Sequence, residues 1–196
     1  AYGKTLGNET IDIASGTYTE SSTFDITHSI TIAGAGASST ILQAATSAGV
    51  ADHRFFKVIG SGVNATVSDL TMRYGVEASG GAINLASGSL TLENVTLSDN
   101  QVKDTSSQGI NGGAISINGG SITLNNCTLT NNSVTTTDTL TTRGNGGAIF
   151  MGSGSVTLNN TTVSGNSALR GGGGLYSNGG TFNVNYSTIA DNTSDS

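Results

Sequence analysis

Apolar and polar residues alternate in short runs along most of the chain. In Leu90-Thr91-Leu92, Ile122-Thr123-Leu124 and Val156-Thr157-Leu158 the outer residues are apolar and the middle residue is threonine. A period of two is typical of a β-strand with one buried face, and threonine suits the outward position because β-branched residues favour strands. No segment shows a sustained apolar period of 3.6 residues with helix caps. We therefore predict many short strands and almost no helix.

The strands belong to an internal repeat. The tetrapeptide Gly80-Gly81-Ala82-Ile83 recurs at residues 112–115 and 146–149, and residues 172–175 hold the variant Gly-Gly-Gly-Leu. Each copy is followed by one alternating triplet of the kind described above and then by a second triplet, at residues 95–97, 127–129, 161–163 and 187–189. Every unit thus carries three short strands.

Strands joined by connections of only a few residues cannot form a β-sandwich, whereas a coil accommodates them. If each unit makes one turn, equivalent strands stack in parallel about 4.8 Å apart and their inward residues share one core. The glycine pairs then fall at corners where φ must be positive. We predict an all-β fold, a right-handed parallel β-helix (a solenoid) of about six turns with three short strands per turn.

We interpret residues 1–196 as a single β-helix domain, with irregular N-terminal turns over 1–75 and GGAI-type repeats over 76–196. Because the sequence begins and ends in repeat-like segments, we expect it to be a fragment of a larger protein. Two N-terminal turns are predicted from short apolar strands, the first from Ile11–Ile13, Phe24–Ile26 and Ile30–Ile32, the second from Phe56–Val58, Ala65–Val67 and Leu70–Met72.

An asparagine recurs three residues beyond an apolar residue in each repeat, at Asn100, Asn132, Asn166 and Asn192. A stacked asparagine amide can bond the backbone of its own turn and the side chain of the neighbouring turn. We therefore predict a structural asparagine ladder at this corner, and we rank ligand binding by these residues below it.

The repeats differ in length just after this asparagine. The segments Gln101–Asn111 and Ser133–Asn145 are long, whereas the last unit has only Ser167–Gly171. Because equivalent corners stack, the two long segments should emerge side by side from one edge. They hold most of the charge of the repeats, so we predict that this edge is a recognition surface, with the candidate residues Lys103, Asp104, Asp138 and Arg143.

Composition narrows the classes of partner. The net charge is −6 with only seven Lys plus Arg, which provides no basic stripe for a nucleic acid backbone. No run of 18 apolar residues is present, so we expect no membrane insertion by this chain. The single Cys127 cannot form an internal disulfide, and we expect it to be buried. Abundant Ser, Thr, Asn and Gly with few Lys are typical of secreted solenoids, which indicates an extracellular or cell-surface location.

The sequence contains no recognisable catalytic, metal or cofactor site. A polysaccharide lyase needs clustered carboxylates for calcium with a basic residue beside them, but the positions one repeat from Glu93 are Asn125 and Asn159. The nearest alternative is a charged group that we interpret as a solvated corner, comprising Asp52, His53, Arg54, Asp69, Arg73, Tyr74 and Glu77. We predict that the chain is not an enzyme and binds no cofactor or metal.

The tetrapeptide GGAI followed by hydrophobic-x-x-Asn resembles the repeat of the chlamydial polymorphic outer membrane proteins, autotransported β-helical adhesins with the motifs GGAI and FxxN. Here Leu97, Leu129, Val163 and Ile189 replace the phenylalanine. Residues 10–18 and 29–36 are similar to the first turns of pectin-lyase-like right-handed β-helices. The resemblance implies the fold more strongly than the function, because lyases, esterases, tailspikes and adhesins share this fold.

These observations favour a structural or adhesive module of a secreted or cell-surface protein. Its partner would be a protein or glycan at a surface, or copies of itself stacked end to end into a filament. The alternative is a polysaccharide-binding or polysaccharide-degrading β-helix. A third hypothesis, an ice-binding face, requires a Thr-x-Thr array in every turn, whereas the triplets predict one outward threonine per strand.

Overall fold

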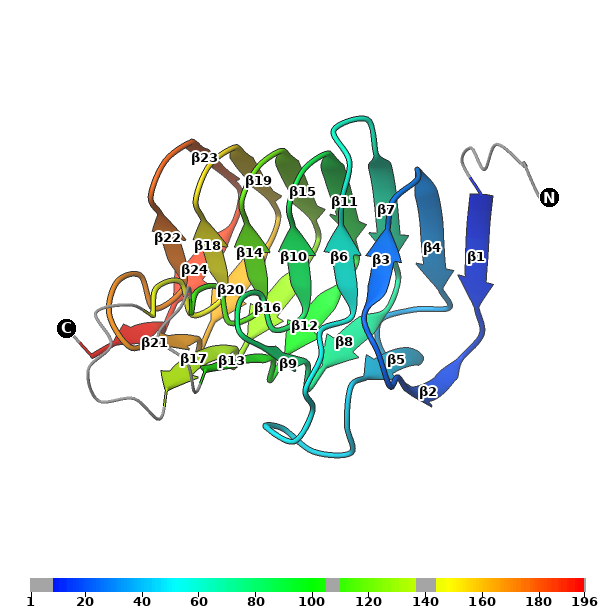
Figure 1. Ribbon diagram of the computed structural model, residues 1–196, viewed down its shortest axis with the longest axis horizontal. Helices are drawn as coiled ribbons and strands as arrows, with labels where there is room; N and C mark the ends of the chain where they lie inside the picture. Colours follow the sequence, from blue (N-terminus) through cyan, green and yellow to red (C-terminus); the bar gives the residue numbers. More distant parts are fainter. Residues whose placement is uncertain (1–8, 105–109, 137–143, 196) are drawn as a thin grey trace.

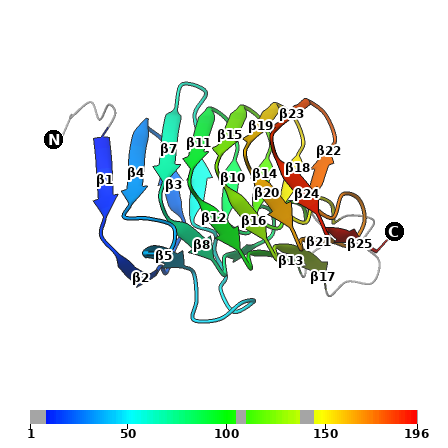
Figure 2. The same cartoon turned by 180° about the vertical axis from the view of Figure 1, so that it is seen from behind.

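The computed structural model describes residues 9–104, 110–136 and 144–195 of the chain. Within these ranges the regular structure consists of short strands that pair only in parallel, and four sheets run along the length of the coil (Figure 1). Seen from behind, the strands of each sheet follow one another from the N-terminal to the C-terminal end (Figure 2). The predicted parallel β-helix is confirmed.

The strands fall into four sheets, which we call A to D. Sheet A contains β1 (Glu9–Ile13), β4 (Ile30–Gly34), β7 (Asn64–Ser68), β11 (Ser89–Glu93), β15 (Ser121–Asn125), β19 (Ser155–Asn159) and β23 (Thr181–Asn185). Sheet B contains β2 (Gly16–Thr19), β5 (Thr40–Gln43), β8 (Thr71–Arg73), β12 (Thr96–Ser98), β16 (Thr128–Thr130), β20 (Thr162–Ser164) and β24 (Thr188–Ala190). Sheet C contains β3 (Phe24–Ile26), β6 (Phe56–Val58), β10 (Ile83–Leu85), β14 (Ile115–Ile117), β18 (Ile149–Met151) and β22 (Leu175–Ser177). Sheet D contains β9 (Val76–Glu77), β13 (Gln101–Asp104), β17 (Ser133–Thr136), β21 (Ser167–Ala168) and β25 (Thr193–Ser194).

Each complete turn passes through sheets C, A, B and D in that order, so a repeat carries four strands. The three strands predicted from the sequence are those of sheets C, A and B. The strand of sheet D follows the asparagine corner, where the sequence analysis expected only loop. It is short and has few inward residues, so it leaves little alternating pattern to detect.

The N-terminal turns are wound differently from the prediction. Strands β1 and β4 pair in register from Glu9 and Ile30 to Ile13 and Gly34, so Ile11–Ile13 and Ile30–Ile32 lie in successive turns. The single turn predicted from them is wrong, because residues 20–23 lead directly from β2 to β3 with no strand in sheet D. Sheets A and B therefore contain seven strands rather than six. In the next turn, residues 44–55 take the place of the sheet D strand.

Inward side chains form continuous rows along one core. Leu92, Leu124 and Leu158 occupy equivalent positions in sheet A and are all 0% exposed. Burying one such side chain contributes on the order of 2 kcal/mol. Buried Leu97, Leu129 and Val163 make the corresponding row of sheet B. These rows hold the turns together because each side chain packs against its copies above and below.

The corners explain the polar residues that recur between strands. After sheet A, the corner residue has positive φ in five successive turns, at Asp69, Asn94, Asn126, Asn160 and Tyr186. Asn and Asp tolerate this conformation better than other non-glycine residues. Before sheet C the chain passes so close to the next turn that a Cβ on Gly113 would lie 2.1 Å from the carbonyl oxygen of Gly147. Glycine is required there by space.

Outward side chains form more rows than the sequence analysis expected. Strands of sheet A present three outward residues and strands of sheet B present two. In sheet B, both Thr128 and Thr130 face outward around buried Leu129. The prediction of one outward threonine per strand is therefore wrong for β16, because the triplet was centred one residue away from the centre of that strand. The strands β12 and β20 present one threonine and one serine.

Candidate functional site

The predicted recognition edge begins at sheet D. Strands β13 and β17 pair in register, with Lys103 opposite Thr135 and Asp104 opposite Thr136. The two long segments therefore leave the coil from adjacent strands. Lys103 is exposed, and nothing further is described for the side chain of Asp104. Asp138 and Arg143 lie outside the described residues.

A small apolar cluster anchors this edge. Val102 and Val134 point inward from β13 and β17 and are at most 2% exposed. They pack with buried Ile110, at the return of the first long segment, and with half-buried Leu169. This cluster is separate from the main core. The edge is thus a packed part of the fold, which fixes the points where the long segments leave and return.

A polar groove lies beside the same edge. It is lined by two residues of the 44–55 loop, by two corner residues that follow sheet B, and by the first residues of β13 and β17, namely Ala48, Gly49, Asp99, Asn131, Gln101 and Ser133. Asp99 and Asn131 have positive φ, which turns the chain at the rim of the groove. The groove joins residues that range from Ala48 to Ser133 in the sequence, so no local motif predicted it.

The four predicted ladder asparagines lie one above another, and three of them are 0% exposed. The Asn132 Oδ1 accepts hydrogen bonds from both the backbone amide and the Nδ2 of Asn100, each at 3.0 Å. The Nδ2 of Asn132 donates to the carbonyl of Leu97 and to the Oδ1 of Asn166. Asn166 repeats these bonds with Asn192. The amides of Asn100, Asn132 and Asn166 therefore each join the preceding turn to the following one. Asn166 also bonds the backbone of its own turn, at the carbonyl of Ser164.

A second set of ladders lies on the outside. The Asn159 Nδ2 donates to the Oδ1 of Asn125 at 2.9 Å, and Asn185 donates to Asn159 at 3.0 Å. At the neighbouring corner, Asn160 donates to Asn126 in the same way. These amides are at least partly exposed to water, so their bonds compete with solvent, unlike those of the buried ladder.

The charged residues singled out from the sequence are tied to separate partners. Asp69 accepts a hydrogen bond from Asn94 at 2.9 Å. Arg73 donates to the Oε1 of Gln43 and lies 4.9 Å from the centre of the Tyr74 ring. Asp69 thus contacts the following turn, and Arg73 contacts the preceding turn.

The remaining charged candidates meet at the 44–55 loop. Arg54 forms an ion pair with Glu77 at 3.2 Å, and His53 Nδ1 lies 3.2 Å from the Oδ1 of exposed Asp52. His53 is 8% exposed, and its Nε2 is buried with no hydrogen-bond partner among the described residues. The Arg54 and Glu77 pair connects this loop to β9, which positions the loop against the third turn. In the described part of the chain, no three His, Cys, Asp or Glu side chains group as a metal site would require.

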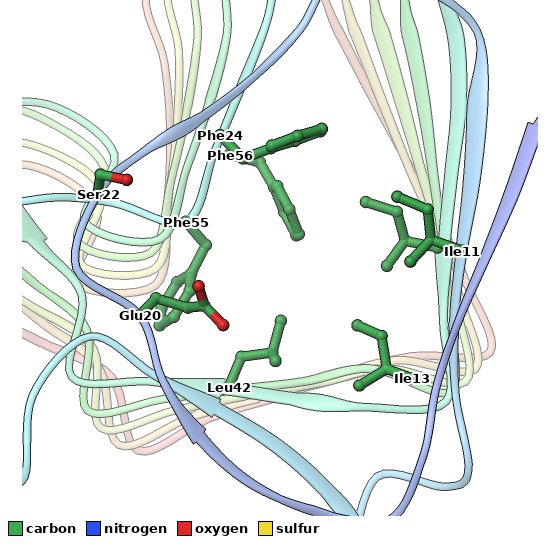
Figure 3. Close-up of a pocket in the computed structure, with 9 residues that line it drawn as sticks. Ile11, Ile13, Glu20, Ser22, Phe24, Leu42, Phe55 and Phe56 are labelled. Atoms are coloured by element: carbon green, nitrogen blue, oxygen red, sulfur yellow. The ribbon is translucent and has the colours of Figure 1, made fainter.

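The N-terminal end of the core is an open apolar cavity. Figure 3 shows Ile11, Ile13, Leu42, Phe55 and Phe56 converging on it, with the carboxylate of Glu20 at its border. Phe24 packs edge-on against Phe56, with ring centres 6.3 Å apart, and is 47% exposed. The sequence analysis assigned Ile11, Ile13, Phe24 and Phe56 to strands and made no prediction for Glu20, Leu42 or Phe55, and it did not indicate that any of them line a cavity.

The single cysteine is part of the core. Burial raises the pKa of the Cys127 thiol from 9.0 to about 11, and backbone hydrogen bonds partly oppose this shift. The equivalent positions in other turns are Leu70, Val95, Thr161 and Ser187. A buried thiol with a raised pKa is mostly protonated at neutral pH and therefore a poor nucleophile.

These features define the molecule as a parallel β-helix repeat protein. Residues 160–178 match the family model of the Chlamydia polymorphic membrane protein repeat. The matched segment contains Asn166 of the buried ladder and the Gly-Gly-Gly-Leu variant at 172–175, so the resemblance found in the sequence is confirmed there. The family points to proteins of the outer membrane or cell surface, which is consistent with an extracellular location.

No curated protein and no solved structure matches the chain significantly. Within the described residues, no helix is long and apolar enough to cross a membrane.

Proposed function

We propose that this chain is an extracellular structural and adhesive module of a secreted or cell-surface protein, in which the sheet D edge contacts a protein or a glycan. The observation that carries this proposal is that, among the repeats from residue 76 onward, length variation is confined to that edge. Successive ladder asparagines are separated by 32, 34 and 26 residues. The additional residues lie between β13 and Ile110 and between β17 and Gly144.

Variable segments on a regular scaffold are where solenoid proteins usually place their binding surface. Here the scaffold beneath them is fixed by the cluster around Val102 and Val134, and the polar groove at Asp99 and Gln101 extends the same edge. Exposed Lys103 adds a positive charge to a chain that is otherwise acidic. Together these features favour recognition over a purely structural role.

End-to-end stacking is the structural part of the proposal. Core residues are exposed at both ends of the described coil, Ile11 and Phe24 by 43% and 47%, Val184 and Ile189 by 44% and 46%. The two ends also present the first and last strands of sheet A in the described coil, β1 and β23. A neighbouring coil, from another copy or from the same protein, would cover these residues and pair these edges. Sedimentation of the chain with and without Val184→Asp tests association between copies.

The adhesive part is tested by replacing residues 105–109 and 137–143 with short Gly-Ser linkers. The variant should keep the circular dichroism spectrum and melting temperature of the wild type while losing binding to immobilised matrix proteins or to a glycan array. Lys103→Glu should weaken the same binding, with Lys57→Glu on sheet C as the matched control. Unchanged binding by the linker variant would exclude this edge.

We also propose that the chain has no catalytic activity. The charged residues that most resemble a catalytic group, Asp69, Arg73 and the pair of Arg54 and Glu77, make the structural contacts described above. Turnover of acidic or neutral polysaccharides that is abolished by Asp69→Asn would replace this proposal with the polysaccharide-degrading alternative.

A further inference from the structure

The outer face of sheet A carries a regular array of hydroxyl groups. Strand register places a threonine at the central outward position in six successive turns, at Thr10, Thr31, Thr66, Thr91, Thr123 and Thr157. A second outward row, two residues earlier, contains Ser89, Ser121, Ser155 and Thr181. The strands β11, β15 and β19 thus present Ser-x-Thr in place of the Thr-x-Thr that the sequence analysis required of an ice-binding face. Serine supplies the second hydroxyl row, so the hydroxyls form a two-dimensional array rather than a single line.

The spacing of this array is set by the backbone. Neighbouring strands lie about 4.8 Å apart, and outward residues along one strand are about 6.6 Å apart. Sheets normally twist, and side-chain ladders are one of the devices that keep them flat. Here the outer ladder of Asn125, Asn159 and Asn185 borders the array. The strands β7, β11, β15 and β19 run side by side in nearly the same direction (Figures 1 and 2).

The hydroxyls of this face are available to water. Among the described residues, Thr91, Thr123 and Thr157 make no side-chain hydrogen bond to the protein and are half-buried. Inward Thr161, by contrast, donates to the carbonyls of Leu124 and Asn159. The outward threonines thus present free hydroxyls and methyl groups at fixed positions.

We propose that the outer face of sheet A binds ice. Ice is an uncharged solid whose surface oxygens repeat in two dimensions at spacings comparable to those of this array. Rigid hydroxyls can bond to ordered water at those positions, and the methyl groups between them cannot disrupt it. From β15 to β23 the outward residues of sheet A are Ser, Thr and Asn, with neither charge nor aromatic ring. That composition suits ice better than a polysaccharide, which usually stacks on aromatic rings.

The test measures thermal hysteresis and inhibition of ice recrystallisation by the 196-residue chain. A bulky side chain at the centre of the array, in Thr123→Tyr or Thr157→Tyr, should abolish both activities because it lifts the face away from the ice. The matched controls are Thr128→Tyr and Thr162→Tyr, which place the same residue on sheet B in the same turns and should keep both activities. Circular dichroism and melting temperature verify that each variant folds.

Two results would overturn the proposal. The first is that the folded wild-type chain neither shapes ice crystals nor lowers their growth temperature. This result would overturn the proposal even if the chain bound crystalline cellulose or chitin. The second is an equal loss of activity in the sheet B variants, which would place the ice contact elsewhere. Two independent pairs of variants keep the test valid if one substitution prevents folding.

Discussion

The central turns and the last turn carry the same motifs but bury them to different extents. Leu124 and Val184 occupy the same row of sheet A, yet Leu124 is 0% exposed and Val184 is 44% exposed. In sheet B the same contrast separates Leu129 from Ile189, at 0% and 46%. A turn of this coil is completed by its neighbours, so the energetic value of a residue depends on its turn as well as on its motif.

The buried ladder should show the largest difference between the two regions. Asn132→Ala leaves the backbone amide of Asn100 and the carbonyl of Leu97 without the side-chain partner that Asn132 provides in a site closed to water. The Oδ1 of Asn166 loses one of its two donors but keeps the backbone amide of residue 132. We expect a loss of roughly 4 kcal/mol in the free energy of unfolding, since each unsatisfied buried group costs about 1–3 kcal/mol. Urea denaturation measures the loss.

Two controls sharpen this prediction. Asn192→Ala removes the equivalent residue from the half-buried last turn, where water can replace the amide, and should cost about 1 kcal/mol. Asn159→Ala removes a rung of the outer ladder and should cost less still. Equal losses at Asn132 and Asn159 would show that burial does not decide the strength of the ladder.

The apolar rows allow the same comparison with one residue type. Val67 and Val184 belong to one row of sheet A, at 0% and 44% exposure. Val67→Ala should cost about 2 kcal/mol through lost burial and the cavity that remains. Val184→Ala should cost well under about 1 kcal/mol because the wild-type side chain is largely hydrated. If the two losses were equal in urea denaturation, the last turn would be covered in solution.

Periodicity decided what could be predicted from the sequence. Inward rows such as Leu92, Leu124 and Leu158 recur once per repeat and alternate with polar residues, so both their strands and their stacking were predictable. The asparagine corner was predictable for the same reason. Ser98 and Thr130 were not recognised as outward residues because the ends of the sheet B strands have no marker in the sequence.

Features that join distant segments could not be predicted. The strand Gln101–Asp104 contains one buried valine and was interpreted as loop, and the groove at Gly49 and Asn131 depends on how the 44–55 loop lies against later turns. The N-terminal winding was misassigned because its turns vary in length and lack the glycine tetrapeptide. The recognition edge remains a prediction, since Asp138 and Arg143 lie outside the described residues.

The smallest expected effect is a pH dependence of the free energy of unfolding, which arises from Cys127 in the central turns. The folded-state pKa of Cys127, about 11, is above the ordinary value of 9.0. The protonated thiol therefore contributes stability that is fully present below pH 9 and is lost as the pH rises towards 11, because the unfolded chain ionises first. Between pH 8 and 10 the wild type should lose about 1 kcal/mol more than Cys127→Val, in which valine repeats the residue at position 95.

The last turn provides the matched control for this effect. Position 187 is the half-buried counterpart of position 127, so Ser187→Cys in the Cys127→Val background should restore little of the pH dependence, because water stabilises a thiolate there. Urea denaturation of the three proteins at pH 8, 9 and 10 gives the comparison, with tyrosine and lysine ionisation common to all of them. If a cysteine at position 187 made the free energy of unfolding depend on pH as strongly as Cys127 does, water would be excluded from the end of the coil as it is from the centre. Another coil would then have to cover that end.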